Sequence, residues 1–267
     1  MASKNENSQK KTYHKKATGE ALKTTEKHEK DHDLKLFGSC FCPFVQRVWI
    51  SLEFKKLDYQ YIEVDPYQKP KSLLEVNPRG LVPALRHGDW GCYESTVLME
   101  YVRFAMQTES NIIAARRPKT EGTFTVVVGS CTLSLVMVPG FYRYLQAQDS
   151  KDQIDHAEEL KTQIGKLVEA GSSEGPFFLG KDMSFVDVQM APWVIRLRKV
   201  LQPYRGWPDP EEGSRWGKWV SAIEEHPAVV STTSTDDLYL DSYERYAENR
   251  PNTSEVQKAI NSGRGLP

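Results

Sequence analysis

Cys42 is the residue of this sequence whose type and position best suit a chemical reaction. It follows a short apolar run, Leu34–Phe37, and directly precedes Pro43, which suits the first position of a helix because its missing N–H costs nothing there. A thiol at a helix N-terminus lies near unpaired backbone N–H groups and the positive end of the helix dipole, and both favour the thiolate. Cys42 is therefore a candidate nucleophile, and an inert buried thiol is the alternative.

A second thiol, Cys40, lies two positions before Cys42. The position at which a Cys-x-x-Cys motif would place a resolving thiol is Val45, so a dithiol oxidoreductase of the usual type is not expected. An external thiol must then resolve any mixed disulfide, and glutathione is the abundant thiol of the cytosol. Ser39 is a rival hydroxyl nucleophile. No metal site is expected, because two further ligands are needed and no nearby His or Cys has ligand spacing.

The segments that must position Cys42 alternate between strand and helix patterns. Leu34–Phe37 predicts a strand, Phe44–Leu52 has apolar residues at helical spacing, and Tyr59–Val64 is rich in residues that favour strands. These segments form a β-α-β unit, which favours parallel strands with a right-handed crossover. The unit places Cys42 at the turn between the first strand and the helix.

The rest of the chain predicts a hairpin and then helices. Residues 81–85 and 90–93 are the two expected strands of the hairpin, and a helix is expected to begin at Ser95. Beyond about residue 108 the pattern is helical, with capping boxes at Ser150 and Ser184. The sequence therefore predicts a small α/β domain followed by an all-helical domain.

Length and composition limit the classes of protein. The 267 residues are 39% hydrophobic and 27% charged, which suffices for one large or two ordinary domains and excludes a mostly disordered chain. With 35 Lys and Arg against 36 Asp and Glu, no basic field favours nucleic acid. Residues 126–138 are too short a run for a membrane span, which needs about 20 residues. Four cysteines in a chain of this length indicate the reducing cytosol rather than a disulfide scaffold.

Several groups of residues resemble the glutathione transferases. The Cys-Pro-Phe sequence that starts at Cys42 resembles the omega class and its fungal omega-like relatives. The residues at 77–85 and 93–95 follow it with family-like spacing. Similar residues return in the helical part at 178–180, 184–187 and 191–193.

The resemblance implies the glutathione transferase fold: an α/β thioredoxin-like N-terminal domain followed by an all-α C-terminal domain. Residues 34–108 are then the glutathione-binding domain, residues 109–119 a linker and residues 120–267 the helical domain. Residues 1–33 contain few large apolar side chains, so we expect them to form a disordered tail.

The resemblance also implies a glutathione site around Cys42. Family members hold the Val82-Pro83 peptide in cis, which exposes the Val82 backbone so that the tripeptide adds like a short antiparallel strand. Glu94 and Ser95 fall where the family binds the γ-glutamyl end, and a carboxylate suits a helix N-terminus. The implied glutathione-binding residues are Phe44, Lys69, Val82, Pro83, Glu94 and Ser95, and the implied second-substrate pocket includes Tyr142 and Trp193.

A Cys at this place implies thiol exchange rather than conjugation, for which the family uses a Tyr or Ser hydroxyl. Cys42 would take a glutathionyl group from a mixed disulfide, and a second glutathione would release it. The implied activities are those of a thioltransferase and a dehydroascorbate reductase, in a cytoplasmic homodimer. The alternative is a non-catalytic glutathione-binding or regulatory module.

One segment departs from the family pattern. Residues 123–139 are β-branched and nearly uncharged, with strand propensity and no polar face, where a long amphipathic helix is expected. Two interpretations stay open for residues 108–138: an error of reading frame or splicing in the gene model, and a genuinely buried helix. Cys131, in this segment, is predicted to be buried and inert, and Cys92, on an expected strand, is predicted to be a core residue.

Overall fold

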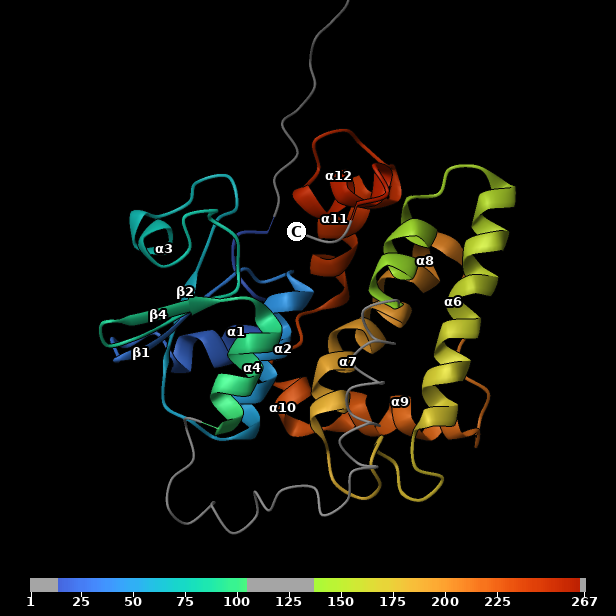
Figure 1. Ribbon diagram of the computed structural model, residues 1–267, viewed down its shortest axis with the longest axis horizontal. Helices are drawn as coiled ribbons and strands as arrows, with labels where there is room; N and C mark the ends of the chain where they lie inside the picture. Colours follow the sequence, from blue (N-terminus) through green and yellow to red (C-terminus); the bar gives the residue numbers. More distant parts are fainter. Residues whose placement is uncertain (1–13, 105–136, 265–267) are drawn as a thin grey trace, which may run out of the picture.

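A computed structural model describes residues 14–104 and 137–264 of the chain. Within them, a four-stranded sheet with its helices lies beside a larger group of helices (Figure 1). This arrangement confirms the expected order of an α/β part followed by a helical part. The expected linker at 109–119 lies outside the described residues, as does Cys131.

The sheet has the strand order β2-β1-β3-β4, in which β1 and β2 are parallel and the other neighbours are antiparallel. The predicted β-α-β unit is therefore correct. The hairpin's first strand was expected from residue 81 but begins at Ala84, because Pro83 has no N–H to donate to a strand ladder. The strands are β1 (Leu34–Gly38), β2 (Gln60–Glu63), β3 (Ala84–His87) and β4 (Trp90–Tyr93).

Alternation along β1 gives the sheet two buried faces. Leu36 belongs to the main core, on the face covered by α2 (Pro43–Phe54) and α4 (Ser95–Phe104). Phe37, the next residue, packs with Leu73 of α3 (Lys71–Val76) in a smaller cluster. Successive side chains of a strand point to opposite faces, so this short strand contributes to both layers.

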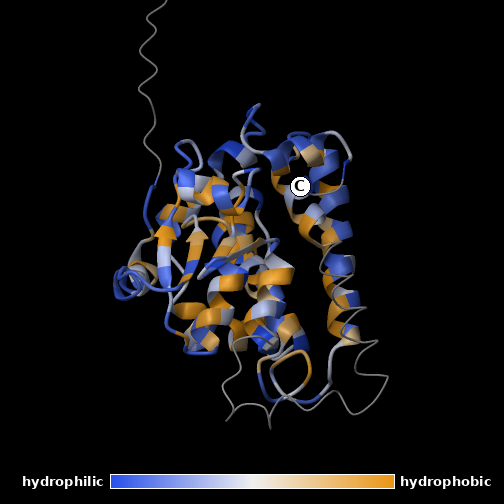
Figure 2. Cartoon of the chain, turned by 60° about the vertical axis from the view of Figure 1, so that its left-hand side comes forward, coloured by the Kyte–Doolittle hydropathy of each residue, from blue (hydrophilic) through white to orange (hydrophobic). Residues whose placement is uncertain are grey.

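The main core continues from α2 into the helical part. α2 packs against α7 (Phe185–Arg196), and Arg47 Nε of α2 donates to the Gln189 carbonyl at 3.0 Å. Hydrophobic residues are concentrated on the strands and the inner helices (Figure 2). The other helical elements are α6 (Ser150–Ala170), η2 (Leu197–Leu201), α8 (Gln202–Arg205), α9 (Arg215–Glu225), α10 (Pro227–Val230), α11 (Asp236–Ala247) and α12 (Glu255–Asn261), and residues 137–146 are also helical.

Two helix starts test the expected capping boxes. The box at Ser184 is confirmed: the buried Asp187 carboxylate accepts from the Ser184 N–H at 2.6 Å and from the Trp219 indole N–H at 2.5 Å. The box at Ser150 is wrong by one residue. Asp149 is the N-cap of α6, and its carboxylate accepts from the Lys151 N–H at 2.8 Å. A carboxylate directly before the helix accepts from one of the unpaired N–H groups of its first turn.

The prediction of a disordered tail over residues 1–33 is wrong for its second half. Residues Gly19–Lys27 form α1, whose Ala21 is fully buried. Thr24 Oγ1 donates to the Ser231 carbonyl at 2.6 Å, and the His28 carbonyl accepts from the β2 residue Tyr61 at 2.8 Å. Small side chains on one face let α1 pack closely between the sheet edge and the helical part, and composition alone does not reveal that partner surface. Residues 1–13 lie outside the described part.

None of the helices in the described residues has the length and apolar character needed to cross a membrane.

Candidate active site

Cys42 lies where the sequence placed it, at the turn between β1 and α2. It is the N-cap of α2, with extended backbone angles (φ −76°, ψ 119°), and Pro43 is the first helical residue. Its side chain is half-buried, and its Sγ lies 3.9 Å from the Val82 carbonyl oxygen. The thiol thus lies directly next to the segment expected to hold glutathione.

The helix N-terminus favours the Cys42 thiolate as expected, but burial acts against it more strongly. Burial raises the pKa of its thiol above the ordinary value, although the N–H groups of Val45 and Phe44 and the cations Arg196 and Arg47 lower it. The free-energy cost of removing water from the thiolate is larger here than the stabilisation that these N–H groups and cations provide. The helix N-terminus therefore reduces the cost of the thiolate without making it the resting form at neutral pH.

Cys40 differs from Cys42 in that it lies beside a carboxylate rather than beside cations. It is buried, its Sγ faces the His14 carbonyl at 3.7 Å, and its N–H donates to Glu63 Oε1 at 2.7 Å. Burial and the nearby carboxylate raise the pKa of Cys40 far above the ordinary value. Cys40 is therefore poorly suited to nucleophilic attack. Cys92 is half-buried on β4, and the rival hydroxyl residue Ser39 is 4% exposed.

The Val82-Pro83 peptide is cis, as the resemblance implied. It directly precedes β3, and the Val82 carbonyl accepts the Cys42 thiol. The preceding turn has its own support, because the Asn77 side chain donates to the Leu81 carbonyl at 2.9 Å. Backbone groups of an extended segment therefore lie beside the candidate nucleophile.

Glu94 and Ser95 are adjacent at the start of α4. Glu94 has φ +80°, which is uncommon for a residue other than Gly, and its carbonyl accepts the Leu98 N–H at 2.9 Å. Its carboxylate is 55% exposed and lies 3.5 Å from the Arg79 guanidinium. Ser95 is 9% exposed and is the first residue of α4. This site thus has an exposed carboxylate beside a helix N-terminus.

Lys69 and Phe44 are placed differently from each other. Lys69 is exposed and lies over the turn at Gly80, where a Cβ atom would be 2.7 Å from its Cδ. Gly80 has φ +63°, a backbone conformation that favours glycine, and the aliphatic part of Lys69 leaves no room for a larger side chain there. The Phe44 N–H points to the Cys42 thiol, whereas its ring packs edge-on against Trp193 at 5.5 Å between centroids.

Tyr142 and Trp193, the candidates for a second-substrate pocket, are both core residues. Trp193 is 0% exposed and Tyr142 is 2% exposed, and each packs against Phe141. Tyr142 still lies close enough to Cys42 for a thiolate there to raise its pKa, after burial as the main cause. Trp193 contributes to the shape of this region only from within the core.

Sequence reasoning missed Arg196 and two tyrosines of α11. A Cys42 thiolate would raise the pKa of both Tyr243 and Tyr246, in addition to the larger effect of burial. Arg196 donates to the Phe41 carbonyl at 2.9 Å and to Tyr243 Oη at 2.6 Å. The available signal was a single cation at the end of the apolar run at 190–195.

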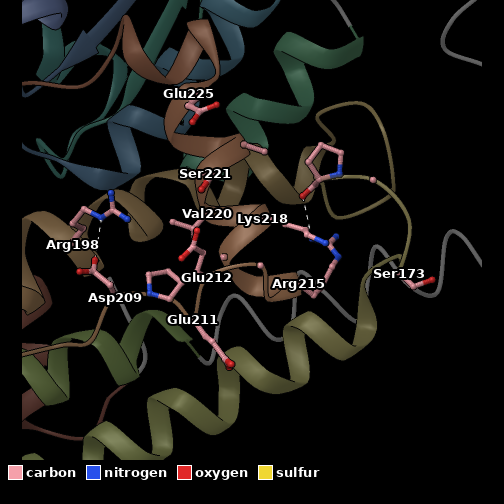
Figure 3. A pocket seen from close by; sticks show the side chains of 16 residues that line it. Ser173, Arg198, Asp209, Glu211, Glu212, Arg215, Lys218, Val220, Ser221 and Glu225 are labelled. Carbon is pink, nitrogen blue, oxygen red and sulfur yellow. Dashed lines mark hydrogen bonds and ion pairs between the residues drawn. The ribbon is translucent and has the colours of Figure 1, made fainter.

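A separate cavity of about 870 Å³ lies on the helical part, around the start of α9 (Figure 3). Its walls include both acidic and basic side chains: Arg198 pairs with Asp209 at 3.6 Å, and Arg215 Nη1 donates to the Pro176 carbonyl at 3.1 Å. None of the residues predicted for the glutathione site lines this cavity. In residues 14–104 and 137–264, no group of three or more His, Cys, Asp or Glu side chains is arranged to hold a metal ion.

Comparisons with known proteins agree with this geometry. The family model described as "Glutathione S-transferase, N-terminal domain" matches residues 36–108, and "Glutathione S-transferase, C-terminal domain" matches residues 133–211. The crystal structure of glutathione transferase Omega 3C from Trametes versicolor is 37% identical, with a TM-score of 0.75, over 87% of this chain and 98% of that chain.

Two further relatives match most of the chain. "Probable glutathione S-transferase DHAR1, cytosolic" of Oryza sativa subsp. japonica is 28% identical over 72% of this chain and 83% of its own length. "Glutathione S-transferase omega-1" of Rattus norvegicus is 26% identical over 82% of this chain and 88% of its own. The chain therefore belongs to the glutathione transferase family, as an omega-like member.

Proposed function

We propose that this glutathione transferase exchanges glutathionyl groups through Cys42. The Cys42 sulfur attacks the glutathionyl sulfur of a mixed disulfide, its S–S bond breaks, and the substrate leaves as a thiol after taking up a proton. A reduced glutathione then attacks the Cys42 mixed disulfide, which gives oxidised glutathione and returns the Cys42 thiol. The net reaction consumes one reduced glutathione and one mixed disulfide. It produces one free thiol and one oxidised glutathione.

The observation that carries this proposal is the placement of a half-buried thiol 3.9 Å from the Val82 carbonyl. A tripeptide that pairs with the Val82 backbone has its central cysteine next to that carbonyl, and its sulfur then lies beside Cys42. We assign the γ-glutamyl ammonium to Glu94 and the γ-glutamyl carboxylate to the N-terminus of α4 at Ser95. Lys69 is assigned to the glycyl carboxylate.

The substrates that we propose are glutathionylated small molecules or proteins, and dehydroascorbate, whose reduction to ascorbate consumes two reduced glutathione molecules and yields one oxidised glutathione. The relatives' names, which include omega-1 and DHAR1, support this assignment. A cytoplasmic location and a homodimer are part of the same proposal, and light scattering after size-exclusion chromatography measures the oligomeric state.

The test is to treat the protein with oxidised glutathione and to locate the adduct by peptide mass spectrometry. We expect the glutathionyl group on Cys42, with Cys40 and Cys92 as internal controls, and we expect reduced glutathione to remove it. An adduct on Cys92 alone, or none at Cys42, contradicts the proposal. Retention on immobilised glutathione without turnover of a glutathionylated peptide favours the non-catalytic module instead.

A further inference from the structure

Arg196 joins the helical part of the molecule to the residues around Cys42. It is the last residue of α7 and is 1% exposed. Its guanidinium donates through Nη2 to the Phe41 carbonyl at 2.9 Å and through Nη1 to Gln46 Oε1 at 2.6 Å. Phe41 directly precedes Cys42 and Gln46 lies in the first turn of α2, so these two contacts lie on either side of the thiol.

The contact with Phe41 gives the Phe41–Cys42 peptide group a second hydrogen bond. The Cys42 N–H donates to the Ser39 carbonyl at 2.9 Å, and the carbonyl of the same peptide group accepts from Arg196. Both polar atoms of this peptide group are therefore hydrogen-bonded, the N–H to the loop before α2 and the carbonyl to α7, and together these bonds fix its orientation. The Gln46 side-chain amide is also hydrogen-bonded at both of its polar atoms: Oε1 accepts from Arg196, and Nε2 donates to the Thr232 carbonyl at 3.1 Å.

The charge of Arg196 has only neutral hydrogen-bond partners in the described part of the chain. Besides Phe41 and Gln46 these are Tyr243 Oη at 2.6 Å and the Pro192 carbonyl at 2.8 Å, and the guanidinium lies 4.9 Å from the Tyr239 ring centroid. A buried cation without an anion is costly, and a nearby negative charge reduces that cost. A thiolate at Cys42 is such a charge, and Arg196 correspondingly lowers the pKa of Cys42 against the effect of burial.

We propose that Arg196 is a positioning residue for the reaction at Cys42: it holds the Phe41–Cys42 peptide and adds a buried positive charge near the thiol, in addition to that of Arg47. The inference rests on the proposed function, because it assigns a role in that chemistry. The other titratable groups around Cys42 come from several elements: Arg47 from α2, Cys40 and Tyr61 from the sheet side, Tyr142 from the helix at 137–146, and Tyr243 and Tyr246 from α11.

The test is the pH dependence of Cys42 alkylation by iodoacetamide, followed by peptide mass spectrometry in Arg196→Gln and Arg196→Lys. For Arg196→Gln we expect the rate at pH 7 to fall about tenfold, which corresponds to an upward shift of about one pH unit in the midpoint. Arg196→Lys keeps the charge but not the planar fork, so we expect about a threefold fall and a smaller shift of the midpoint.

Arg215→Gln is the matched control. Arg215 donates to the carbonyls of Ser172, Pro176 and Phe177, so its loss also leaves backbone acceptors, here partly buried, without their donor, on a part of the helical region away from Cys42. We expect it to lower the melting temperature without changing the alkylation profile. If either folded Arg196 variant alkylates with the rate and midpoint of the unsubstituted protein, the inference is overturned.

If Arg196→Gln does not fold, Arg196→Lys decides the question by the same measurement. If neither folds, the milder variant Tyr243→Phe is measured in their place; it removes a hydrogen-bond partner of Arg196 and a second donor to the Phe41 carbonyl, and an unchanged Cys42 profile overturns the inference. Alkylation needs no glutathione, so its result is independent of turnover. A slower Arg196→Gln together with an unsubstituted protein that forms no glutathionyl Cys42 refutes the proposed function but leaves the effect on the thiol intact.

Discussion

Cys40 and Cys42 mark two sides of one short loop, and the two sides differ in what surrounds the sulfur. On the Cys40 side the N-terminal segment closes over the loop: His14 accepts from the thiol, and the Ala17 N–H binds Glu63. On the Cys42 side the thiol is half-buried beside the Val82 carbonyl, at a helix N-terminus with a buried cation nearby.

Burial raises the pKa of both thiols, so burial by itself does not separate them. The neighbouring charge does, because Glu63 disfavours a second negative charge at Cys40, whereas Arg196 and Arg47 favour one at Cys42. The difference shows that two thiols two residues apart acquire different reactivity from the elements that pack on either side of them.

The largest expected effect distinguishes the two thiols by turnover. Cys42→Ser should lower the rate of deglutathionylation of a glutathionylated peptide by about a thousandfold, because a hydroxyl forms no mixed disulfide. Cys40→Ser should change that rate by less than about threefold, since its thiol faces the N-terminal segment. Equal losses in the two variants would contradict the division between the two sides. The assay couples release of oxidised glutathione to glutathione reductase.

The next effect tests the packing of the Cys40 side. Ala21→Glu places a carboxylate in a fully buried position of α1, and we expect the free energy of unfolding to fall by about 3 kcal/mol. Lys23→Glu introduces the same side chain at a position that is 71% exposed; it replaces an exposed ion pair with Glu20 by a like-charge pair and should cost about 1 kcal/mol at most. Urea denaturation followed by circular dichroism measures both. Equal stability of the two variants would show that α1 is not docked.

Alkylation rates provide a smaller and more direct test of the two thiols. The raised pKa of Cys42 predicts that its alkylation rate keeps rising with pH past about 8.5, the ordinary value for a thiol. At pH 8 we expect Cys42 to react about tenfold faster than Cys40, whose thiol is buried beside the Glu63 carboxylate and has a strongly raised pKa. Peptide mass spectrometry resolves the two sites. A Cys42 rate that is already constant below pH 7 would disprove the raised pKa.

The smallest effect concerns Glu63, whose pKa burial raises to about 8. A carboxyl group with an unfolded value near 4.3 binds more protons when folded, so the stability that it contributes is complete below about pH 4.3 and is lost as the pH rises to about 8. Glu63→Gln removes this titration, so we expect the stability of the variant, relative to that of the unsubstituted protein, to rise between pH 5 and pH 8.

Thermal unfolding at a series of pH values measures this gain. Glu75→Gln, an exposed carboxylate 3.5 Å from the Arg86 guanidinium, is the control and should leave the pH dependence of the melting temperature unchanged. Parallel pH curves for Glu63→Gln and the unsubstituted protein would contradict the raised pKa.

The sequence by itself determined the features that depend on neighbouring residues along the chain. A strand pattern, then Cys42 and Pro43, predicted the turn at which the thiol lies, and the structure has that turn. The parallel β-α-β unit and the capping box at Ser184 were also correct. Such features are local, because hydrophobic spacing and helix capping involve residues only a few positions apart.

Only the tertiary structure decided how the chemistry is surrounded. The residues that tune the thiol come from far along the chain, since Arg196 reaches the Phe41 carbonyl across 155 positions. The order of α1 depends on contacts with Ser231 and Ser234, which its own polar composition does not indicate. The direction of the Cys42 pKa shift followed from burial, which the helix N-terminus does not overcome. Burial and charge pairing are set by what packs against a residue, and that information is not present in the spacing of the residues around it.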